Sequence, residues 1–255
     1  MTQPDWTTAA LHSEIAVSTA YGGVPTAYPT FTHIHNSFVP WAGDFNRAVG
    51  IQCTSYNSFL AAVAQVEDRH QTLRLDPPTR FDLHPSTGAE PSWVAQLANH
   101  NSRVETALFF QSPTQQIATT QQLTLYTPTP EEYTTWYHQR QQAQSFYTVT
   151  YWDVLLPLQL RFIQTFQPYW LLYNSQMVGW VYCAVLGGYS RLFEVEISES
   201  WRGRGFGTAL LHLLQTHCYQ QGITHILLQS GERLRPFYER AGFQICVRNR
   251  VVWRG

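Results

Sequence analysis

The sequence predicts an α/β (α+β) fold in which a central mixed β-sheet is flanked by helices. Two observations support this prediction. Strand-length apolar runs alternate with longer helical segments through the second half of the chain. One of these strands, Leu192 to Ile197, leads through a glycine-rich loop into a helix that begins near Gly207. Units of this kind build sheets that contain parallel strands.

The elements of the second half follow one another clearly. Thr129 and Pro130 precede two acidic residues, which is the pattern of a helix cap followed by a favourable first turn. Asn174-Ser175-Gln176 is a hairpin turn, and Pro157 should bend or break the helix that contains it. The predicted order is a strand (123–126), two helices (129–145 and 151–166), three strands (169–173, 177–186 and 192–197), a helix (207–221), a strand (225–229), a helix near 235–241 and a last strand.

The glycine-rich loop is the most informative stretch of the chain. Its glycines stand at alternate positions, so the backbone can curl and bring several N–H groups to one point. The following helix adds the positive end of its dipole, and the whole forms a cradle for a phosphate or diphosphate. The G-x-G-x-G spacing fits neither the nucleotide-hydrolase loop nor the dinucleotide fingerprint. The loop reads Arg202-Gly203-Arg204-Gly205-Phe206-Gly207-Thr208.

This loop resembles motif A of the GNAT superfamily of acyl-CoA-dependent N-acyltransferases, in which Arg or Gln is followed by x-x-Gly-x-Gly or x-x-Gly-x-Ala. A second stretch, Arg235 to Phe243, resembles the superfamily's aromatic signature, Phe or Leu followed by Tyr-x-x-x-Gly-Phe. The two motifs lie in order, with a helix and a strand between them. The resemblance covers about residues 120–255 and implies a complete GNAT fold there.

The first half carries a weaker version of the same pattern. A helix (56–70), a short strand (73–75), a helix (91–100) and a strand (104–110) repeat the order of the elements from 207 to 250. We therefore expect residues 1–118 to form a degenerate GNAT-like N-terminal lobe and residues 119–255 to form the catalytic GNAT domain. Cys53 to Asn57 stand where a glycine loop would be needed, so the first lobe should not bind CoA. An unrelated cap domain is the alternative.

The resemblance also implies where acyl-CoA binds as a co-substrate. Backbone N–H groups from Gly203 to Thr208 would hold the diphosphate, with charge from Arg202 and Arg204. The pantetheine arm would pair with the strand before the loop, and Ser230 would stand in for an asparagine that many relatives carry at Gly231. The expected binding residues are Val195, Glu196, Ile197, Arg202, Gly203, Arg204, Gly205, Phe206, Gly207, Thr208 and Ser230.

Three residues are candidates for catalysis. The resemblance implies that Tyr238 protonates the leaving thiolate, and its alternative role is core packing. Glu194 and Glu196 lie on one strand, and either could accept the proton that an amine must lose before it attacks. The alternative is that both are solvated or paired with Arg191 or Arg204.

The acceptor is expected to be a primary amine of a small molecule or peptide. Aromatic residues crowd the segments that should form its pocket, which suggests an apolar or aromatic acceptor, or a longer acyl chain than acetyl. A non-catalytic module that binds or senses acyl-CoA remains the alternative function. The aromatic residues are Trp136, Tyr137, Tyr147, Tyr151, Trp152, Tyr169, Trp170 and Trp180.

Composition and residue spacing argue against several other classes of function. A formal net charge of −1 does not indicate binding to nucleic acid, and no apolar run of membrane-spanning length is present. The four cysteines have no metal or redox spacing. His33 and His35 are expected to pack rather than bind a metal, so no metal site is predicted. We expect a cytoplasmic monomer or homodimer without membrane insertion.

Overall fold

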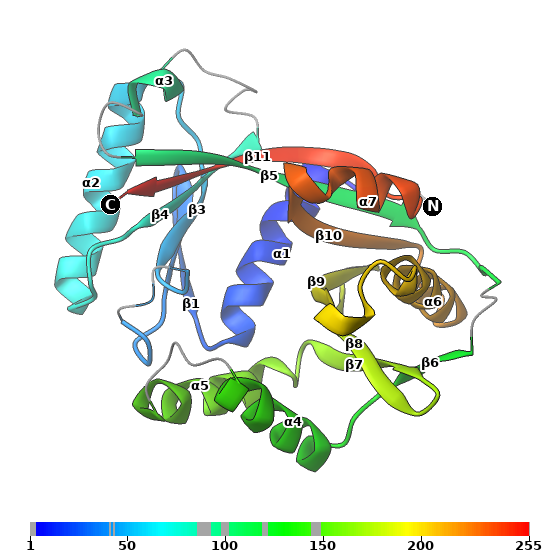
Figure 1. The fold of residues 1–255 in the computed structure, drawn as a ribbon. Helices are drawn as coiled ribbons and strands as arrows, with labels where there is room; N and C mark the ends of the chain where they lie inside the picture. Colours follow the sequence, from blue (N-terminus) through cyan, green and yellow to red (C-terminus); the bar gives the residue numbers. More distant parts are fainter. Residues whose placement is uncertain are drawn as a thin grey trace. The chain divides into compact units, whose positions relative to one another are not determined.

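The computed structural model describes residues 4–40, 42, 44–85, 93–97, 102–118, 122–143 and 149–254. The chain divides into two compact units (Figure 1). The first unit comprises Met1–Phe109, Ser230–Glu232 and Ile245–Gly255, and the second comprises Phe110–Gln229 and Arg233–Gln244. The sequence predicts a boundary between two domains after residue 118. The two compact units do not test that boundary, so it stays a prediction.

The first unit is a sheet with helices packed on its third strand. Within it the strand order is β1-β2-β3-β4-β11-β5, and β3 and β4 are parallel. Strand β11 is the last of the chain, and it pairs antiparallel with β4, which comes much earlier in the sequence. The elements are α1 (Trp6–Ala20), β1 (Val24–Tyr28), β2 (Phe31–His35), β3 (Arg47–Ile51), α2 (Tyr56–Leu73), β4 (Arg80–Leu83), α3 (Val94–Leu97), the greater part of β5 (Ser102–Pro113) and nearly all of β11 (Gln244–Arg254).

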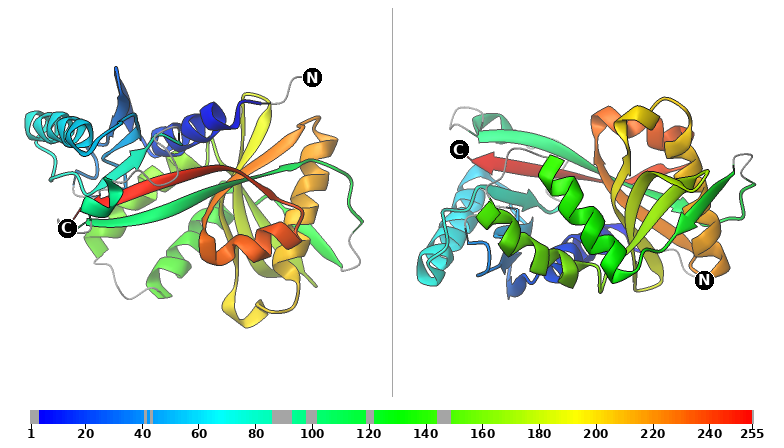
Figure 2. Two further views of the ribbon diagram at one scale, coloured as in Figure 1. Left: turned by 90° about the horizontal axis from the view of Figure 1, so that it is seen from above. Right: turned by 60° about the horizontal axis from the view of Figure 1, so that its bottom comes forward.

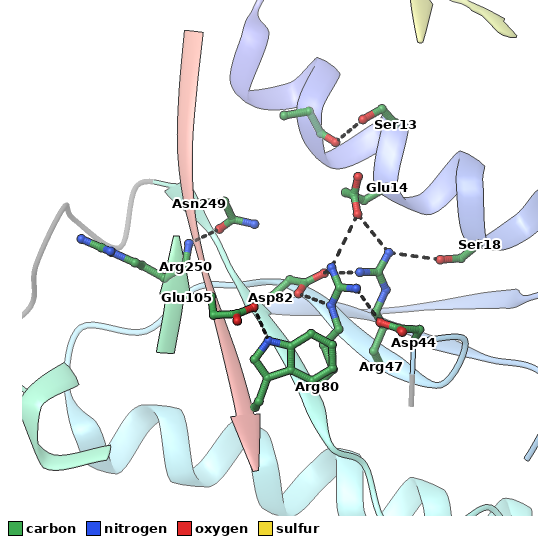
Figure 3. A network of polar contacts seen from close by, with 12 residues as sticks. Ser13, Glu14, Ser18, Asp44, Arg47, Arg80, Asp82, Glu105, Asn249 and Arg250 are labelled. Atoms are coloured by element: carbon green, nitrogen blue, oxygen red, sulfur yellow. Dashed lines mark hydrogen bonds and ion pairs between the residues drawn. The ribbon is translucent and has the colours of Figure 1, made fainter. Parts of the chain in front are cut away.

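A network of charges lies in this first unit between α1, β3 and β4 (Figure 3). Arg47 is 3% exposed and contacts Asp82 at 2.6 Å and Glu14 at 3.1 Å. Arg80 contacts Asp82 at 2.9 Å and Asp44 at 2.7 Å. Asp82 is fully buried and contacts both arginines, and removing one partner of such a buried pair costs about 3–5 kcal/mol. The network thus fixes the packing of α1 on the sheet.

The second unit is a sheet covered by helices on both faces. Its strand order is β10-β9-β8-β7-β6, with β9 and β10 parallel and the other neighbours antiparallel. Helices α4 and α5 cover one face and α6 covers the other (Figures 1 and 2). The elements are β6 (Leu123–Tyr126), α4 (Pro130–Ala143), α5 (Val149–Phe162), β7 (Gln167–Tyr173), β8 (Gln176–Leu186), β9 (Tyr189–Ile197), α6 (Phe206–Gln220), most of β10 (His225–Gly231) and α7 (Arg235–Arg240).

The local signals of the second half are confirmed. Thr129 and Glu132 cap α4 reciprocally, since each accepts the backbone N–H of the other at 2.8 and 3.2 Å. Asn174 and Ser175 both have positive φ, the geometry of a two-residue hairpin turn between β7 and β8. The mixed α/β architecture and the predicted order of elements from β6 onward are also confirmed.

Other predictions were wrong in detail. Helix α5 runs from Val149 to Phe162 without a break at Pro157, and it ends before residue 166. The predicted strand at 73–75 is the end of α2, where Arg74 adopts the left-handed conformation and Leu75 donates to the carbonyl of His70. Of the helix predicted over 91–100, Val94–Leu97 is helical, and residues 91, 92 and 98–100 lie outside the described residues.

The described helices contain no segment that is both long and apolar enough to cross a bilayer.

Candidate active site

A bulge interrupts β9 at Glu194. Tyr182 of β8 opposes Phe193 and Trp180 opposes Glu196, so two residues of β9 face a single residue of β8. Glu194 has φ +50°, a left-handed conformation that is uncommon for a residue other than glycine. A bulge of this kind leaves a residue unpaired and redirects side chains, and bulges are frequent beside active sites.

The parallel pairing of β9 with β10 lies before this bulge. It runs from Tyr189, opposite His225, to Leu192, opposite Leu228. Val195, Glu196 and Ile197 therefore follow the paired stretch, and a short 3₁₀-helix (Glu199–Trp201) separates them from the glycine-rich loop. This is the segment whose backbone is expected to pair with a pantetheine arm.

The loop ends in a helix N-terminus that has no side-chain cap. Gly203 and Gly205 have φ values of +77° and +82°, and Gly205 is the N-cap residue of α6. The cap makes no side-chain hydrogen bond, and the first helical bond runs from Ala209 N to Gly205 O at 3.1 Å. The backbone N–H groups of Phe206, Gly207 and Thr208 therefore remain available, together with the positive end of the helix dipole. This arrangement fits a diphosphate.

Gly207 lies against a neighbouring helix. A Cβ atom added there would lie 3.1 Å from the ring of Phe237 and 3.7 Å from the side chain of Ile197. The missing side chain thus makes room for α7, and the part that Gly207 plays in binding a diphosphate stays a prediction. The contact also shows that the end of β9, the start of α6 and α7 meet at one point.

The two loop arginines are held by neighbouring groups. Arg202 contacts the carboxylate of Glu196 at 2.5 Å and donates to the carbonyl of Ile197 at 3.0 Å. The guanidinium of Arg204 lies 4.9 Å from the centre of the Trp201 ring. Glu196 is thus paired with an arginine, and the partner is Arg202 rather than Arg191 or Arg204.

Glu194 forms a longer ion pair, with a residue of α4. Its carboxylate lies 3.5 Å from the guanidinium of Arg140. The side chain is 40% exposed, yet enough protein surrounds it that burial raises its pKa. Arg140 opposes this shift, whereas the neighbouring charge of Glu196 adds to it. A carboxyl group with a raised pKa is a better proton acceptor than an ordinary one.

Arg140 was missed by the sequence analysis. Its guanidinium lies 4.5 Å from the ring centre of Trp180 and 5.5 Å from that of Trp136. Trp136 and Arg140 stand four residues apart on α4, so they share one face of the helix, and this spacing was the available signal. What it could not reveal is that this face meets the bulge of β9.

The aromatic residues expected around the acceptor do not all lie together: some neighbour a buried hydrogen-bond network, and one lies on the other face of the sheet. Tyr133 and Tyr182 share a hydrogen bond of 2.8 Å, and Gln159 donates to Tyr133 at 2.7 Å. Burial raises the pKa values of Tyr133 and Tyr137. Tyr169, expected near the acceptor, instead lies 3.0 Å from His217 on α6, across the sheet from α4. Tyr147 and the side chains of Tyr151 and Trp152 lie outside the described residues.

Tyr238 lies in an aromatic core. It is 5% exposed, and its ring lies 5.2 Å from Phe110, 4.9 Å from Phe237 and 6.1 Å from Phe243. This burial suits the packing role as well as the catalytic one. Ser230 belongs to the first unit, whereas the loop belongs to the second, so its contact with a ligand stays a prediction.

Comparisons with known proteins agree with this architecture. Residues 125–243 match the model of the acetyltransferase (GNAT) family. A functionally unknown conserved protein from Staphylococcus epidermidis superposes with a TM-score of 0.71 at 9% identity, covering 91% of this chain and 94% of that chain. A GCN5-related N-acetyltransferase from Kribbella flavida gives 0.65 at 12% identity, with 96% and 95% covered.

A tandem GNAT protein from the clavulanic acid biosynthesis pathway superposes with a TM-score of 0.52 at 13% identity, covering 87% of this chain and 77% of that chain. Identities this low show the shared fold alone. No curated protein matches the sequence significantly.

Proposed function

We propose that this chain, in which residues 125–243 form a GNAT domain, is an acyl-CoA-dependent N-acyltransferase. It would transfer an acetyl or longer acyl group to the primary amine of a small molecule or peptide, by direct attack in a ternary complex. The observation that carries the proposal is the N-terminus of α6, which has no side-chain cap and is the next α-helix after the bulged strand β9.

Acyl-CoA would bind through the backbone. The N–H groups from Gly203 to Thr208 hold the diphosphate, because they converge without a competing side-chain cap. The pantetheine arm would follow Val195 to Ile197, and the family pattern adds Ser230 as a further candidate contact. Arg202 and Arg204 add positive charge at this end of α6, although each is also engaged by a neighbour.

The reaction forms one bond and breaks another. The amine nitrogen attacks the thioester carbonyl carbon, an amide bond forms, and the carbon–sulfur bond breaks to release CoA. The amine loses one proton, and the thiolate gains one. A backbone N–H at the bulge of β9 would stabilise the negative charge that develops on the carbonyl oxygen.

Glu194 is the better of the two candidate bases. Burial raises its pKa, and its partner Arg140 is 3.5 Å away, whereas Glu196 is held at 2.5 Å by Arg202. Glu194 accepts the proton of the amine, and Tyr238 donates a proton to the thiolate. A thiol of ordinary pKa is protonated readily near neutral pH, so a modest donor suffices.

The test is acyl transfer itself. The protein is incubated with acyl-CoAs of increasing chain length and a panel of primary amines, and free thiol is followed. We expect thiol release that depends on both substrates, with competition between acyl-CoAs fixing the preferred chain length. Failure to bind any acyl-CoA saturably would contradict the proposal. Tight binding without transfer to any amine would favour the alternative, a non-catalytic acyl-CoA-binding or sensing module.

A further inference from the structure

The site on α4 and β9 also suggests what the acceptor is. Resting on the proposed function, we propose that the acceptor amine is a free α-amino acid with an apolar side chain, whose carboxylate binds Arg140 and whose amine lies at Glu194.

The Arg140–Glu194 pair can be opened by a ligand. Charge-assisted hydrogen bonds normally measure about 2.7–2.9 Å, and this contact measures 3.5 Å. Within the described residues, Glu194 is the acidic partner of Arg140, and a guanidinium carries five N–H donors in a planar fork. Arg140 therefore has donors that Glu194 does not use, and a substrate carboxylate can accept two of them side by side.

The surroundings hold Arg140 in place for this contact. The rings of Trp180 and Trp136 lie against its guanidinium. Stacking on indole faces does not use the N–H groups at the edge of the guanidinium, and 25% of the Arg140 side chain is exposed, so a carboxylate can reach it. Trp136 also lies 5.9 Å from Trp170 and 5.3 Å from Trp180, so the same cluster offers an apolar wall for a side chain.

The charges match a zwitterion. An α-amino acid carries a cationic amine and an anionic carboxylate on one carbon, and these can pair with Glu194 and Arg140 respectively. A polycationic acceptor would be repelled by Arg140, and a peptide N-terminus lacks the adjacent carboxylate. When the carboxylate engages Arg140, that guanidinium no longer favours the ionised form of Glu194, and Glu194 becomes a stronger base for the amine proton.

Equilibrium binding and turnover together test this inference. Phenylalanine, leucine and methionine are each compared with the corresponding amide and with the decarboxylated amine, using calorimetry for binding and free thiol for turnover. The wild-type protein is compared with Arg140→Met. Arg161→Met is the matched control, because it removes one arginine charge from an exposed position in the last turn of α5.

We expect at least one amino acid to bind tighter than its amide and its amine. Arg140→Met should weaken that binding by roughly 10- to 100-fold, the range expected for losing hydrogen bonds to a charged group, so that the acid no longer binds tighter than the amide and the amine. Arg161→Met should behave like wild type. Arg140→Lys should restore only part of the affinity, because an ammonium lacks the planar fork.

Two results would overturn the inference: equal binding of the acid, amide and amine, or a preference for the acid that survives in Arg140→Met. A uniform fall in turnover for all acceptors, with a shifted pH profile, would show that Arg140 acts only through Glu194. Carboxylate-dependent amino-acid binding in a protein that binds no acyl-CoA would support this site while refuting the proposed acyl transfer.

Discussion

Two helices, α2 and α6, each follow a bulged strand that pairs with a parallel neighbour, yet they begin in opposite ways. In the first unit, Ser55 caps α2 and accepts the N–H of Ser58 at 3.1 Å, while Ser58 accepts the N–H of Ser55 at 3.0 Å. In the second unit, Gly205 precedes α6 and provides no side-chain cap. The chain thus caps one helix N-terminus with a side chain and leaves the other without a side-chain cap.

The strands before these helices show the same contrast. Gly50 of β3 has φ +72° beside a register shift against β4, and Glu194 of β9 has φ +50° beside a register shift against β8. Glycine adopts this conformation without strain, whereas glutamate does not. Strain retained at a polar residue is typical of functional sites. The two units therefore share a left-handed residue beside a register shift, and only in the second unit is that residue a candidate for catalysis.

The largest expected effect comes from closing the open helix terminus. Gly205→Val should weaken acyl-CoA binding by about 100-fold or more, because a β-branched residue resists φ +82° and its side chain enters the region of the diphosphate. Calorimetry measures the affinity. Gly222→Val is the matched control, since Gly222 has φ +74° at the far end of α6. Normal acyl-CoA affinity in Gly205→Val would place the phosphate site elsewhere.

The second effect tests the strained residue of β9. Glu194→Gln keeps the shape but cannot accept a proton, so turnover should fall by roughly 10²- to 10⁴-fold while acyl-CoA affinity is retained. In the wild type, turnover should fall as the pH drops through the pKa of Glu194, which burial holds above that of an ordinary carboxyl. Glu196→Gln is the control, and a larger loss there than in Glu194→Gln would reverse the two assignments.

Tyr238→Phe should lower turnover by roughly 10- to 1,000-fold, because only the hydroxyl that protonates the thiolate is removed. The buried ring is kept, so the unfolding midpoint and the acyl-CoA affinity should change little. Single-turnover measurements separate chemistry from product release. An unchanged chemical rate would assign Tyr238 to packing, as its 5% exposure also allows.

The first unit should respond to pH through stability rather than activity. His33 is fully buried, with its ring 5.1 Å from His70 and 6.1 Å from His35. Burial, together with the charges of His70, His35 and Arg69, lowers the pKa of His33 to about 3. Burial also lowers the pKa values of His35 and His70, with Glu67 partly opposing the shift at His70.

The unfolded chain therefore binds protons that the folded unit excludes. Stability should be complete above about pH 6.5 and should decrease as the pH falls toward 3. The loss from His33 alone should be on the order of 2 kcal/mol between pH 6.5 and 4.5. Urea unfolding of the wild type and of His33→Phe measures it: the variant should lose less stability over this range, and identical pH dependence would contradict the assignment.

The smallest effect comes from opening the closed helix terminus. Ser55→Ala removes the cap of α2 and should lower the free energy of unfolding by about 1 kcal/mol. Acyl-CoA affinity should not change, because α2 holds no diphosphate. A loss of acyl-CoA affinity in Ser55→Ala would break the contrast between the two helices.

Local signals made much of the second unit predictable. The cap at Thr129, the hairpin at Asn174-Ser175 and the loop at Gly203 to Thr208 all lie within a few residues of the elements they define. The bulge at Glu194 was not predictable, because its alternating sequence looks like an ordinary strand. The family pattern located the loop, but not Arg140, whose partner Glu194 lies on another element far along the chain.

The first unit was harder to predict because its order depends on distant contacts. Arg47 and Asp82 form a buried pair between two different strands. The last strand of the chain pairs with β4, and no local pattern in residues 244–254 indicates that partner. Helix α1 was missed although Asp5 accepts the N–H groups of Thr7 and Thr8, the contacts of an ordinary N-cap.

The central claim is that the N-terminus of α6, and not that of α2, binds the diphosphate of acyl-CoA. Backbone amide NMR during a titration with CoA tests it directly. We predict that the largest shifts occur at Phe206, Gly207 and Thr208 and saturate together, while the amides of Asn57 and Ser58 do not move. Saturable shifts at the α2 amides, or CoA binding that leaves the α6 amides unchanged, would contradict the account.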